Sequence, residues 1–372
     1  SSTFFRNNLF TLCHLIYTDT FYMKRKWIRW VSWILLTPII LFVILMVLLY
    51  VPPVQNLLRR EVTAYASKAT GMQIQVERID LRFPLNLLVR GVEVIQQPDT
   101  LLSLESLNVR VQAWPLIKGK VEVDEVTLSR VAVNSADLME GMKIKGVLGR
   151  FFLQSHGVDL SNELAVINQV ELSDTHMQLL MNDTTTTPKD TTASAPINWK
   201  VALHQLKLKN VSFSMQLPAD SMRMTAHIGE AAINDAQADL KNQYYDLKKF
   251  LLLGTSASYD TGTAQPTEGF DASHIAVRDI RIALDSLLYK GRDMNAVIRE
   301  FTMNERSGLS VTALTGRAYS NDSVICVPSL KLNTPHSEID LSAHTYWELV
   351  NIPTTGRLSA RLNAYIGKED VM

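Results

Sequence analysis

The chain of 372 residues contains only two cysteines, Cys13 and Cys326. Two thiols form at most one disulfide bond, so a disulfide framework and a cysteine-clustered zinc site are both excluded. Lysine plus arginine number 37, and aspartate plus glutamate also number 37, which leaves no net charge. Because a phosphate backbone is attracted by a broad cationic field, we do not expect nucleic acid as a partner.

Motifs of the common catalytic and cofactor sites are also missing. The sequence has no G-x-S-x-G, no G-x-x-x-x-G-K-[ST] and no G-x-G-x-x-G after a strand pattern. The eight histidines are scattered, and no H-E-x-x-H motif occurs. Glu122, Asp124 and Glu171 alternate with apolar residues, as on the solvated face of a strand. We therefore expect no catalytic residues, no metal and no cofactor, and a protein that is not an enzyme.

The composition instead favours a well-ordered chain with much apolar surface. Hydrophobic residues make up 47% of the sequence and charged residues 20%, which excludes wholesale disorder. Residues 1–22 have no initiator methionine and no clean periodicity, whereas a coherent pattern begins at Met23. We interpret residues 1–22 as a non-native upstream segment, with a genuine leader as the alternative.

Residues 23–52 carry the pattern of a membrane anchor. No charged residue occurs between Trp30 and Arg59, and Val31 to Val51 would span about 31 Å as a helix, close to the thickness of a bilayer core. No small-residue cleavage site follows, so we predict an uncleaved signal anchor. Basic residues before the span place the amino end in the cytoplasm. The predicted anchor residues are Lys24, Arg25, Lys26, Arg29, Trp30, Trp33, Leu41 and Leu48.

A second, amphipathic helix is predicted over residues 53–71. Its apolar face would be formed by Val54, Leu57, Leu58, Val62, Tyr65, Ala66 and Ala69. Gly71 stands where a helix commonly ends. Such a helix after a membrane exit either lies on the lipid surface or covers the first strand of a sheet. We favour the second alternative, because a sheet that begins at Met72 has an edge to protect.

From Met72 onward the hydrophobic period changes to two, which predicts strands. A recurrent pattern has apolar residues at its third and fifth positions, then a polar pair, then a second alternating run. We interpret this unit as strand, short turn, strand. It occurs at Asp124–Val133, Asn168–Leu179 and His204–Met215, and more loosely at Arg278–Tyr289 and Pro328–Leu341.

About 300 residues of such units, without crossover helices, favour a mainly β fold: an elongated, solenoid-like antiparallel sheet over residues 72–372. Roughly 25 to 30 strands at a spacing of about 4.8 Å would make a rod of about 120 to 145 Å. Leu138–Gln154 and Ala236–Leu253 are also predicted as strand. The Thr-rich stretch 183–196 is predicted as a flexible surface loop within the sheet.

The amino-terminal part of the chain carries a family resemblance. A basic end, one membrane span, Pro52-Pro53-Val54 opening a short helix, Ile74–Pro84 and Val89–Val94 follow one another as in the TamB/AsmA-like family. The resemblance covers Met23 to about Val133 well, and the remainder only as a style of repeat. No single motif is strict, but the ordered combination is specific.

The resemblance implies a single-pass inner-membrane protein of a diderm envelope, with the bulk in the periplasm folded as an elongated β-groove, or β-taco. In that family the apolar groove is implicated in phospholipid movement to the outer membrane. The TamB branch is implicated in outer-membrane protein assembly with an Omp85-type barrel partner. Catalytic residues do not carry over, because the functional surface of the family is an apolar lining.

The chain departs from the family at its carboxyl end. It stops at Lys368–Met372 in mid-pattern, so we expect a fragment that lacks the barrel-binding end. The expected partners are phospholipid acyl chains and the inner membrane. Two functions stay open, a lipid conduit and a membrane-tethered scaffold whose sheet edge pairs with client strands. The groove-lining candidates are Val126, Leu128, Val170, Leu172, Leu206, Leu208, Leu330 and Leu332.

Overall fold

The computed structural model describes residues 50–83, 85–96, 99–112, 114–115, 122–139, 142–159, 162–181, 198–351 and 356–370. The chain divides into two units, Ser1–Leu58 and Arg59–Met372. The predicted segment 1–22, the anchor residues from Lys24 to Leu48 and the Thr-rich stretch 183–196 lie outside the described residues. Within the described ranges, no helix is both long enough and apolar enough to span a membrane.

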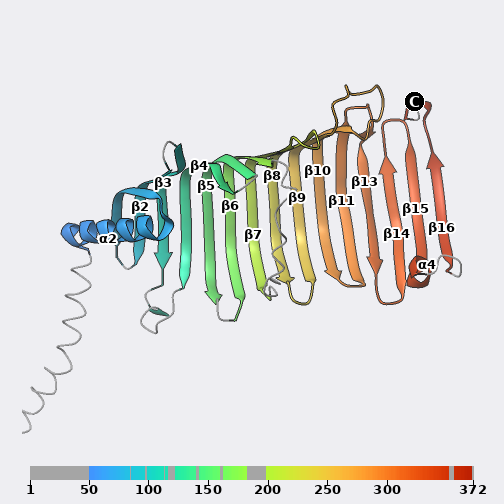
Figure 1. The fold of residues 1–372 in the computed structure, drawn as a ribbon. Coiled ribbons are helices and arrows are strands. Elements are labelled where there is room, and N and C mark those ends of the chain that lie inside the picture. The colour runs from blue at the N-terminus through green and yellow to red at the C-terminus, as the bar shows by residue number, and fades with distance from the viewer. Residues whose placement is uncertain are drawn as a thin grey trace, which may run out of the picture. The chain divides into compact units, whose positions relative to one another are not determined.

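The second unit is built around one open sheet, which confirms the mainly β prediction (Figure 1). Apart from β12, each strand pairs with the next along the chain, so β11 pairs with β13, and β1 and β16 form the two outer edges. The strands are β1 Gln73–Arg82, β2 Asn86–Gln96, β3 Asp99–Val111, β4 Val123–Met139, β5 Met142–Asp159, β6 Leu164–Met181, β7 Lys200–Leu217, β8 Met222–Asp239, β9 Tyr244–Asp260, β10 His274–Lys290, β11 Asp293–Glu305, β12 Ser310–Val311, β13 Ala313–Ser320, β14 Val324–Asn333, β15 Glu338–Tyr346 and β16 Leu358–Tyr365. Short β12 pairs with β11, off the main path. The helical elements are α2 Pro52–Thr70, α4 Trp347–Asn351 and the 3-10 helix η1 Lys368–Asp370.

The recurrent pattern is one long strand, so the interpretation as strand, short turn, strand was wrong for most units. Asp124–Val133 lies within β4, Asn168–Leu179 within β6 and His204–Met215 within β7. Pro328–Leu341 does make a turn, between β14 and β15. Because β4 to β10 contain 17 or 18 residues each, the described residues form a 16-stranded sheet instead of 25 to 30 short strands.

The polar pair inside each unit marks an interruption of the strand. In β4 the apolar run Val126-Thr-Leu128 is followed by the polar pair Ser-Arg130 and then by the apolar run Val131-Ala-Val133. Arg130 and the residue opposite it on β5, Gly149, are left out of the ladder of paired residues. The same gap continues through the sheet, at Asp174 beside Asn210. Positive φ angles lie along it at Gly91, Arg130, Asp174, Asn210, Gly254 and Asp279.

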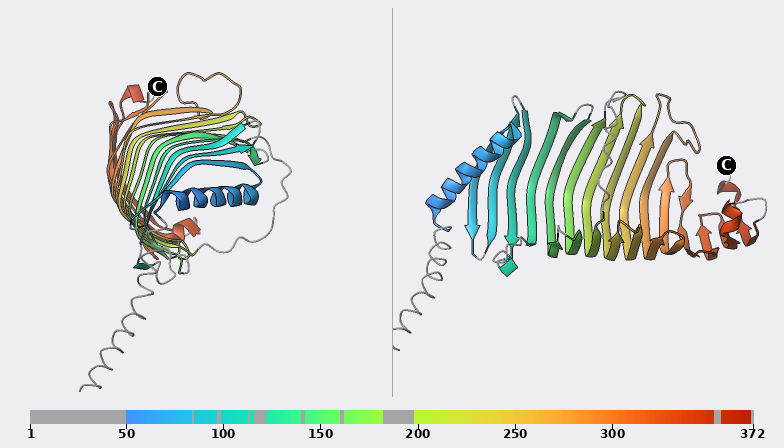
Figure 2. Two further views of the ribbon diagram at one scale, coloured as in Figure 1. Left: turned by 90° about the vertical axis from the view of Figure 1, so that its left-hand side faces the viewer. Right: turned by 60° about the horizontal axis from the view of Figure 1, so that its bottom comes forward.

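We call these six positions the kink line. A left-handed residue breaks the strict alternation of side chains, so the apolar residues before and after the polar pair can share one face. Figure 2 shows the long strands bending partway along their length. Neighbouring polar side chains support the line: Arg130 Nε donates to Glu105, and Asn210 Nδ2 donates to Asp174 Oδ1 at 2.7 Å.

Glycine is required where the interrupted strands approach each other. A Cβ atom on Gly149 would lie 2.7 Å from Cβ of Asp174 and 2.9 Å from its carbonyl oxygen. Such separations are below ordinary van der Waals contact, so no side chain fits there without movement of β6.

Two further strand predictions are confirmed, and one feature of the topology was wrong. Leu138–Gln154 holds the end of β4 and most of β5, and Ala236–Leu253 forms a hairpin of β8 and β9. The sheet was predicted to be antiparallel throughout, but β6 and β7 are parallel. Parallel neighbours need a connection that returns the chain to its starting edge, so the parallel pairing requires such a return between Met181 and Lys200.

The predicted helix over residues 53–71 is confirmed as α2. From Arg59 onward its polar side contacts the outer edge of β1: Arg59 Nη1 donates to Glu77 O at 2.6 Å, and Ile74 N donates to Ser67 Oγ at 3.1 Å. The helix therefore covers the first strand, as we favoured, but it does so with polar groups that satisfy free backbone atoms of an edge strand.

The kink line predicts a position-specific cost at Asn210. Valine disfavours the left-handed conformation that Asn210 adopts at φ 53°, so Asn210→Val is expected to lower the free energy of unfolding by about 1–2 kcal/mol. Asn210→Gly should change it by less than about 0.5 kcal/mol, because glycine adopts this conformation freely. Urea titrations measure the free energy of unfolding of both variants. An equal loss in Asn210→Val and Asn210→Gly would contradict the role of the left-handed conformation at this position.

The parallel pair predicts a minimum length for the connection 182–199. Deleting residues 184–195 leaves a linker that reaches about 25 Å, whereas the 18 residues of β6 extend over about 59 Å along the strand. The deletion should disrupt β6–β7 pairing and lower the melting temperature. A Gly/Ser replacement of equal length is the control and should keep it. An unchanged melting temperature in the deletion would contradict the parallel topology.

Candidate functional site

Apolar side chains form two continuous rows across the sheet. Directly paired residues on neighbouring strands point to the same face, so the register identifies each row. The first row runs from β1 to β11 through Ile79, Val89, Leu107, Leu128, Phe151, Leu172, Leu208, Ala231, Leu252, Ile282 and Phe301.

The second row lies two residues from the first on β1 to β10 and three residues from it on β11, where the pairing with β10 has a bulge. It reaches β16, with Gly316 as its one member without a side chain. It runs through Leu81, Leu87, Val109, Val126, Leu153, Val170, Leu206, Ile233, Phe250, Leu284, Ile298, Gly316, Leu330, Leu341 and Leu362. Side chains two residues apart on a strand share a face, so both rows lie on one surface. We call this surface the apolar face.

The structure brings the predicted lining residues together. Leu128, Leu172 and Leu208 occupy the first row; Val126, Val170, Leu206 and Leu330 occupy the second. Leu332 lies two residues from Leu330, between Leu314 and Ile339. All eight are half-buried. The predictions were made on separate segments, and the register shows that the segments share one surface.

Sequence analysis missed most of the other members of the rows. Phe151 lies between Leu128 and Leu172, and Ile233 lies directly beside Leu206. Leu252 lies one strand beyond Ala231, which pairs with Leu208. The sequence did contain a pattern that identifies these residues. In β2, β3 and β8 as well, two apolar residues separated by one residue are followed by a polar pair or a glycine, and then by two more such apolar residues.

The opposite face mixes polar side chains with a few apolar ones, Phe152 and Val147 among them. Thr127, Glu171 and Lys207 are registered beside one another through β5, next to Leu128, Leu172 and Leu208 in sequence. Farther along the strands, His176 pairs with Ser212, and Ser212 Oγ lies 2.9 Å from His227 Nδ1. The sheet therefore presents two chemically different surfaces in this region.

Little covers the apolar face. No large side chain is fully buried in the described part of the chain, and the well-buried apolar residues there are Ile79, Leu101, Leu104, Ala165, Ala231, Ala283 and Val311. The sheet is a single layer, and neither a second sheet nor a helix of more than five residues accompanies β2 to β16 among the described residues. Among the described residues, Ile79 and Ala231 are the buried members of the rows, and the other members remain accessible to a ligand or a partner.

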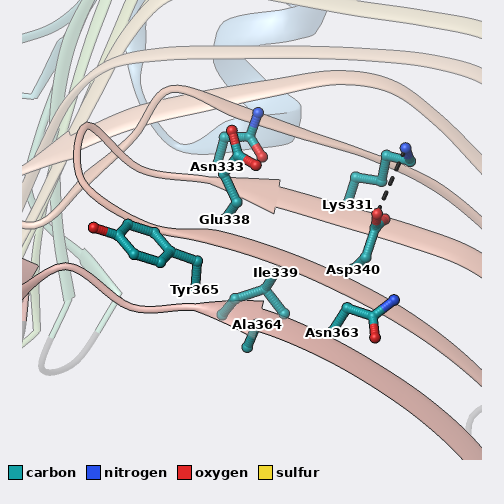
Figure 3. Close-up of a pocket in the computed structure, with 8 residues that line it drawn as sticks. All are labelled: Lys331, Asn333, Glu338, Ile339, Asp340, Asn363, Ala364 and Tyr365. Carbon is teal, nitrogen blue, oxygen red and sulfur yellow. Dashed lines mark ion pairs between the residues drawn. The ribbon is translucent and has the colours of Figure 1, made fainter.

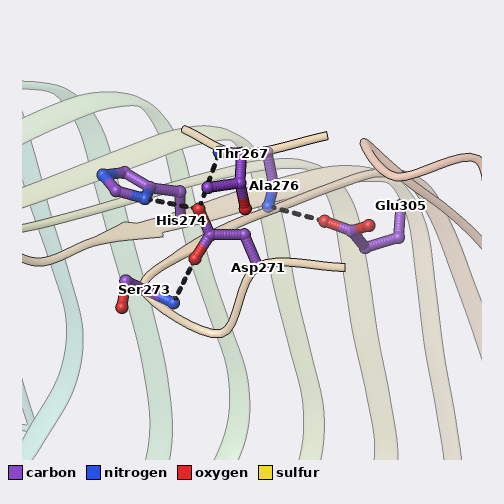
Figure 4. Close-up of polar contacts among 6 residues, drawn as sticks. All are labelled: Thr267, Asp271, Ser273, His274, Ala276 and Glu305. Carbon is purple, nitrogen blue, oxygen red and sulfur yellow. Dashed lines mark hydrogen bonds and ion pairs between the residues drawn. The ribbon is translucent and has the colours of Figure 1, made fainter. Parts of the chain in front are cut away.

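The most perturbed ionisable group lies in the loop before β10. Asp271 accepts hydrogen bonds from the backbone N–H of Thr267 at 3.1 Å and of Ser273 at 2.9 Å, and Oδ2 lies 2.9 Å from His274 Nδ1 (Figure 4). These contacts, the Thr267 N–H foremost, hold the pKa of the Asp271 carboxyl well below its ordinary value. Asp271 thus closes the loop on itself, a structural role.

Glu305 ties the same loop region to β11. Burial alone would raise the pKa of this carboxyl, but hydrogen bonds from Ser307 and Ala276 outweigh burial and lower it. The Ser307 N–H donates at 2.6 Å and the Ala276 N–H at 3.2 Å. Both carboxylates accept hydrogen bonds from backbone N–H groups. Such contacts stabilise turns and are not the arrangement of a catalytic acid–base pair.

A hollow of about 400 Å³ lies at the β16 end of the sheet (Figure 3). Its lining is mixed, with Lys331, Glu338 and Tyr365 among its residues, and Lys331 Nζ pairs with Asp340 Oδ2 at 3.7 Å. That ion pair is exposed and contributes little binding energy. In the part of the chain that the structure describes, no three His, Cys, Asp or Glu side chains gather to hold a metal ion.

The loop closed by Asp271 should be sensitive to acid. Because its pKa is lowered in the folded state, the ionised carboxylate stabilises the loop above the ordinary value of 3.8 and this stabilisation is lost as the pH falls. Hydrogen exchange at the amides of Thr267 and Ser273, corrected for intrinsic rates, should be faster in Asp271→Asn at pH 7. The difference should shrink progressively as the pH falls below 3.8.

Glu268→Gln is the matched control, since Glu268 is exposed in the same loop. It should leave both amides protected. Equal protection in Asp271→Asn and the unmodified chain at pH 7 would show that the carboxylate does not hold the loop.

Comparisons with known proteins do not assign the chain to a family. No protein-family model matches the chain, and no curated protein matches it significantly.

Proposed function

We propose that this protein binds phospholipid acyl chains along its apolar face and conducts lipid between the inner and outer membranes of a diderm envelope. One observation supports the proposal most directly: the two apolar rows run across the strands, and no second layer covers them among the described residues. Acyl chains that lie on such rows leave water while their head groups stay solvated. No cofactor, metal or catalytic residue is needed, since lipid slides along a continuous surface.

The kink line supports a trough with the apolar face on its inner side. Side chains at a bend are most exposed on the outer, convex side. Arg130 and Asp279 on the kink line have side chains 74% and 71% exposed. The apolar residues on either side of them are half-buried. This contrast favours polar groups outside and apolar rows inside, as in the β-groove of the TamB/AsmA-like family.

The membrane anchor is part of the proposal and is argued from sequence. Val31 to Val51 has the length and hydropathy of a span, and Lys24, Arg25, Lys26 and Arg29 precede it. A single-pass inner-membrane anchor with a periplasmic sheet would place the first strands next to a source of lipid. An Omp85-type barrel is the proposed partner at the outer membrane.

A second candidate is a scaffold for outer-membrane protein assembly, and the edge strand β16 favours it. All eight residues of Leu358–Tyr365 are exposed, and the outer edge of β16 has no partner strand among the described residues. A free edge can accept a client strand by backbone hydrogen bonding. Leu358 and Leu362 are each 61% exposed and would contact such a strand.

Native mass spectrometry of the full chain, released gently from detergent, distinguishes the two functions. The conduit predicts several phospholipids per chain. Leu172→Asp combined with Leu208→Asp should reduce bound lipid at least tenfold, because two adjacent carboxylates would interrupt the first row. The scaffold predicts that lipid content is unaffected.

Val147→Asp is the matched control. Val147 is 52% exposed and pairs with His176 on the opposite face, so its substitution should leave bound lipid unchanged. Circular dichroism must show that each variant keeps its sheet. A folded double variant with normal lipid content, or a folded unmodified chain without lipid, would reject the conduit and favour the scaffold.

A further inference from the structure

Helix α2 exposes its apolar side. Val62, Tyr65 and Ala69 lie three and four residues apart and therefore on one stripe of the helix. Val62 is 47% exposed and Tyr65 77%, and Ala69 is exposed as well. An amphipathic helix that packs on a protein core normally buries such a stripe.

The polar side of the helix is occupied instead. Arg59, Thr63 and Ser67 are spaced four residues apart, and all three are shielded. Arg59 and Ser67 are bonded to the backbone of β1, at Glu77 O and Ile74 N. Because these contacts fix the rotation of the helix about its axis, the apolar stripe cannot turn toward β1 without breaking them.

The surroundings of the stripe indicate which surface covers it. From Arg59 to Thr70 the helix has three basic residues and one acidic residue, so it is cationic. Arg60 and Lys68 are exposed. The predicted membrane span from Val31 to Val51 ends immediately before the helix begins at Pro52. A cationic helix with an exposed aromatic and aliphatic stripe, directly after an apolar span, has the chemistry of a helix that lies in a lipid interface.

We propose that α2 lies on the anionic surface of the bilayer, with Val62, Tyr65 and Ala69 inserted at the boundary between head groups and acyl chains. This inference rests on the proposed membrane anchor and adds a second lipid contact. It assigns α2 two partners at once, the edge of β1 on its polar side and the membrane on its apolar side. The apolar face of the sheet would then begin beside the bilayer.

Site-directed spin labelling of the full chain tests this assignment. In a background with Cys13→Ser and Cys326→Ser, a nitroxide is attached at Tyr65→Cys or, as control, at Ala64→Cys. Ala64 is exposed on the neighbouring side of the same turn. The protein is reconstituted into vesicles of phosphatidylethanolamine and phosphatidylglycerol, and collision with oxygen and with a water-soluble nickel chelate is measured.

Position 65 is expected to collide with oxygen and to be protected from nickel, whereas position 64 collides with nickel. Nickel collision at both positions in vesicle-bound protein would overturn the interfacial assignment while leaving the anchor intact. Protection of position 65 from both reagents would overturn it in favour of a protein partner on the stripe. Failure of the unlabelled chain to float with vesicles would reject the anchor itself, and the assignment with it.

Discussion

The architecture depends on one backbone constraint, the left-handed residues of the kink line. An uninterrupted strand of 17 or 18 residues alternates its side chains strictly, and would place half of each apolar segment on the wrong face. The polar pair with a positive φ residue resets that alternation. It also bends the strand, and because the interruption falls at the same place in neighbours, the hydrogen-bonded ladder resumes on both sides. Gly149 and its neighbours leave room for this close approach.

A second consequence is that apolar residues accumulate on one surface without forming a closed core. Most globular domains bury such a surface against another layer. Here the described residues supply a single sheet, and most members of the two rows remain half-buried. The stability of the sheet then comes mainly from cross-strand side-chain pairs and the backbone ladder. The same organisation that leaves the face uncovered makes it suited to a ligand that is itself long and apolar.

Much of the fold could be predicted from periodicity, and the misses have physical causes. The alternation of Val126, Leu128, Val170 and Leu172 correctly identified strands and a shared apolar surface. The polar pair was interpreted as a turn, since Ser, Asp and Asn are the residues that favour both turns and left-handed positions. Pairwise register is not encoded locally, so neither the continuity of the rows nor the parallel pair of β6 and β7 could be derived. The face of α2 that meets β1 was also unpredictable, because hydrophobicity suggests the apolar side and the edge strand selects the polar one.

Adjacent residues on opposite faces of β7 allow the most direct test of the central claim. A photoactivatable amino acid introduced at Leu206, on the second apolar row, or at Lys207, on the polar face, can be cross-linked in intact cells. The account predicts phospholipid adducts at position 206 and almost none at position 207. Equal labelling at the two positions, or adducts at 207 alone, would contradict the claim that lipid lies along the apolar face.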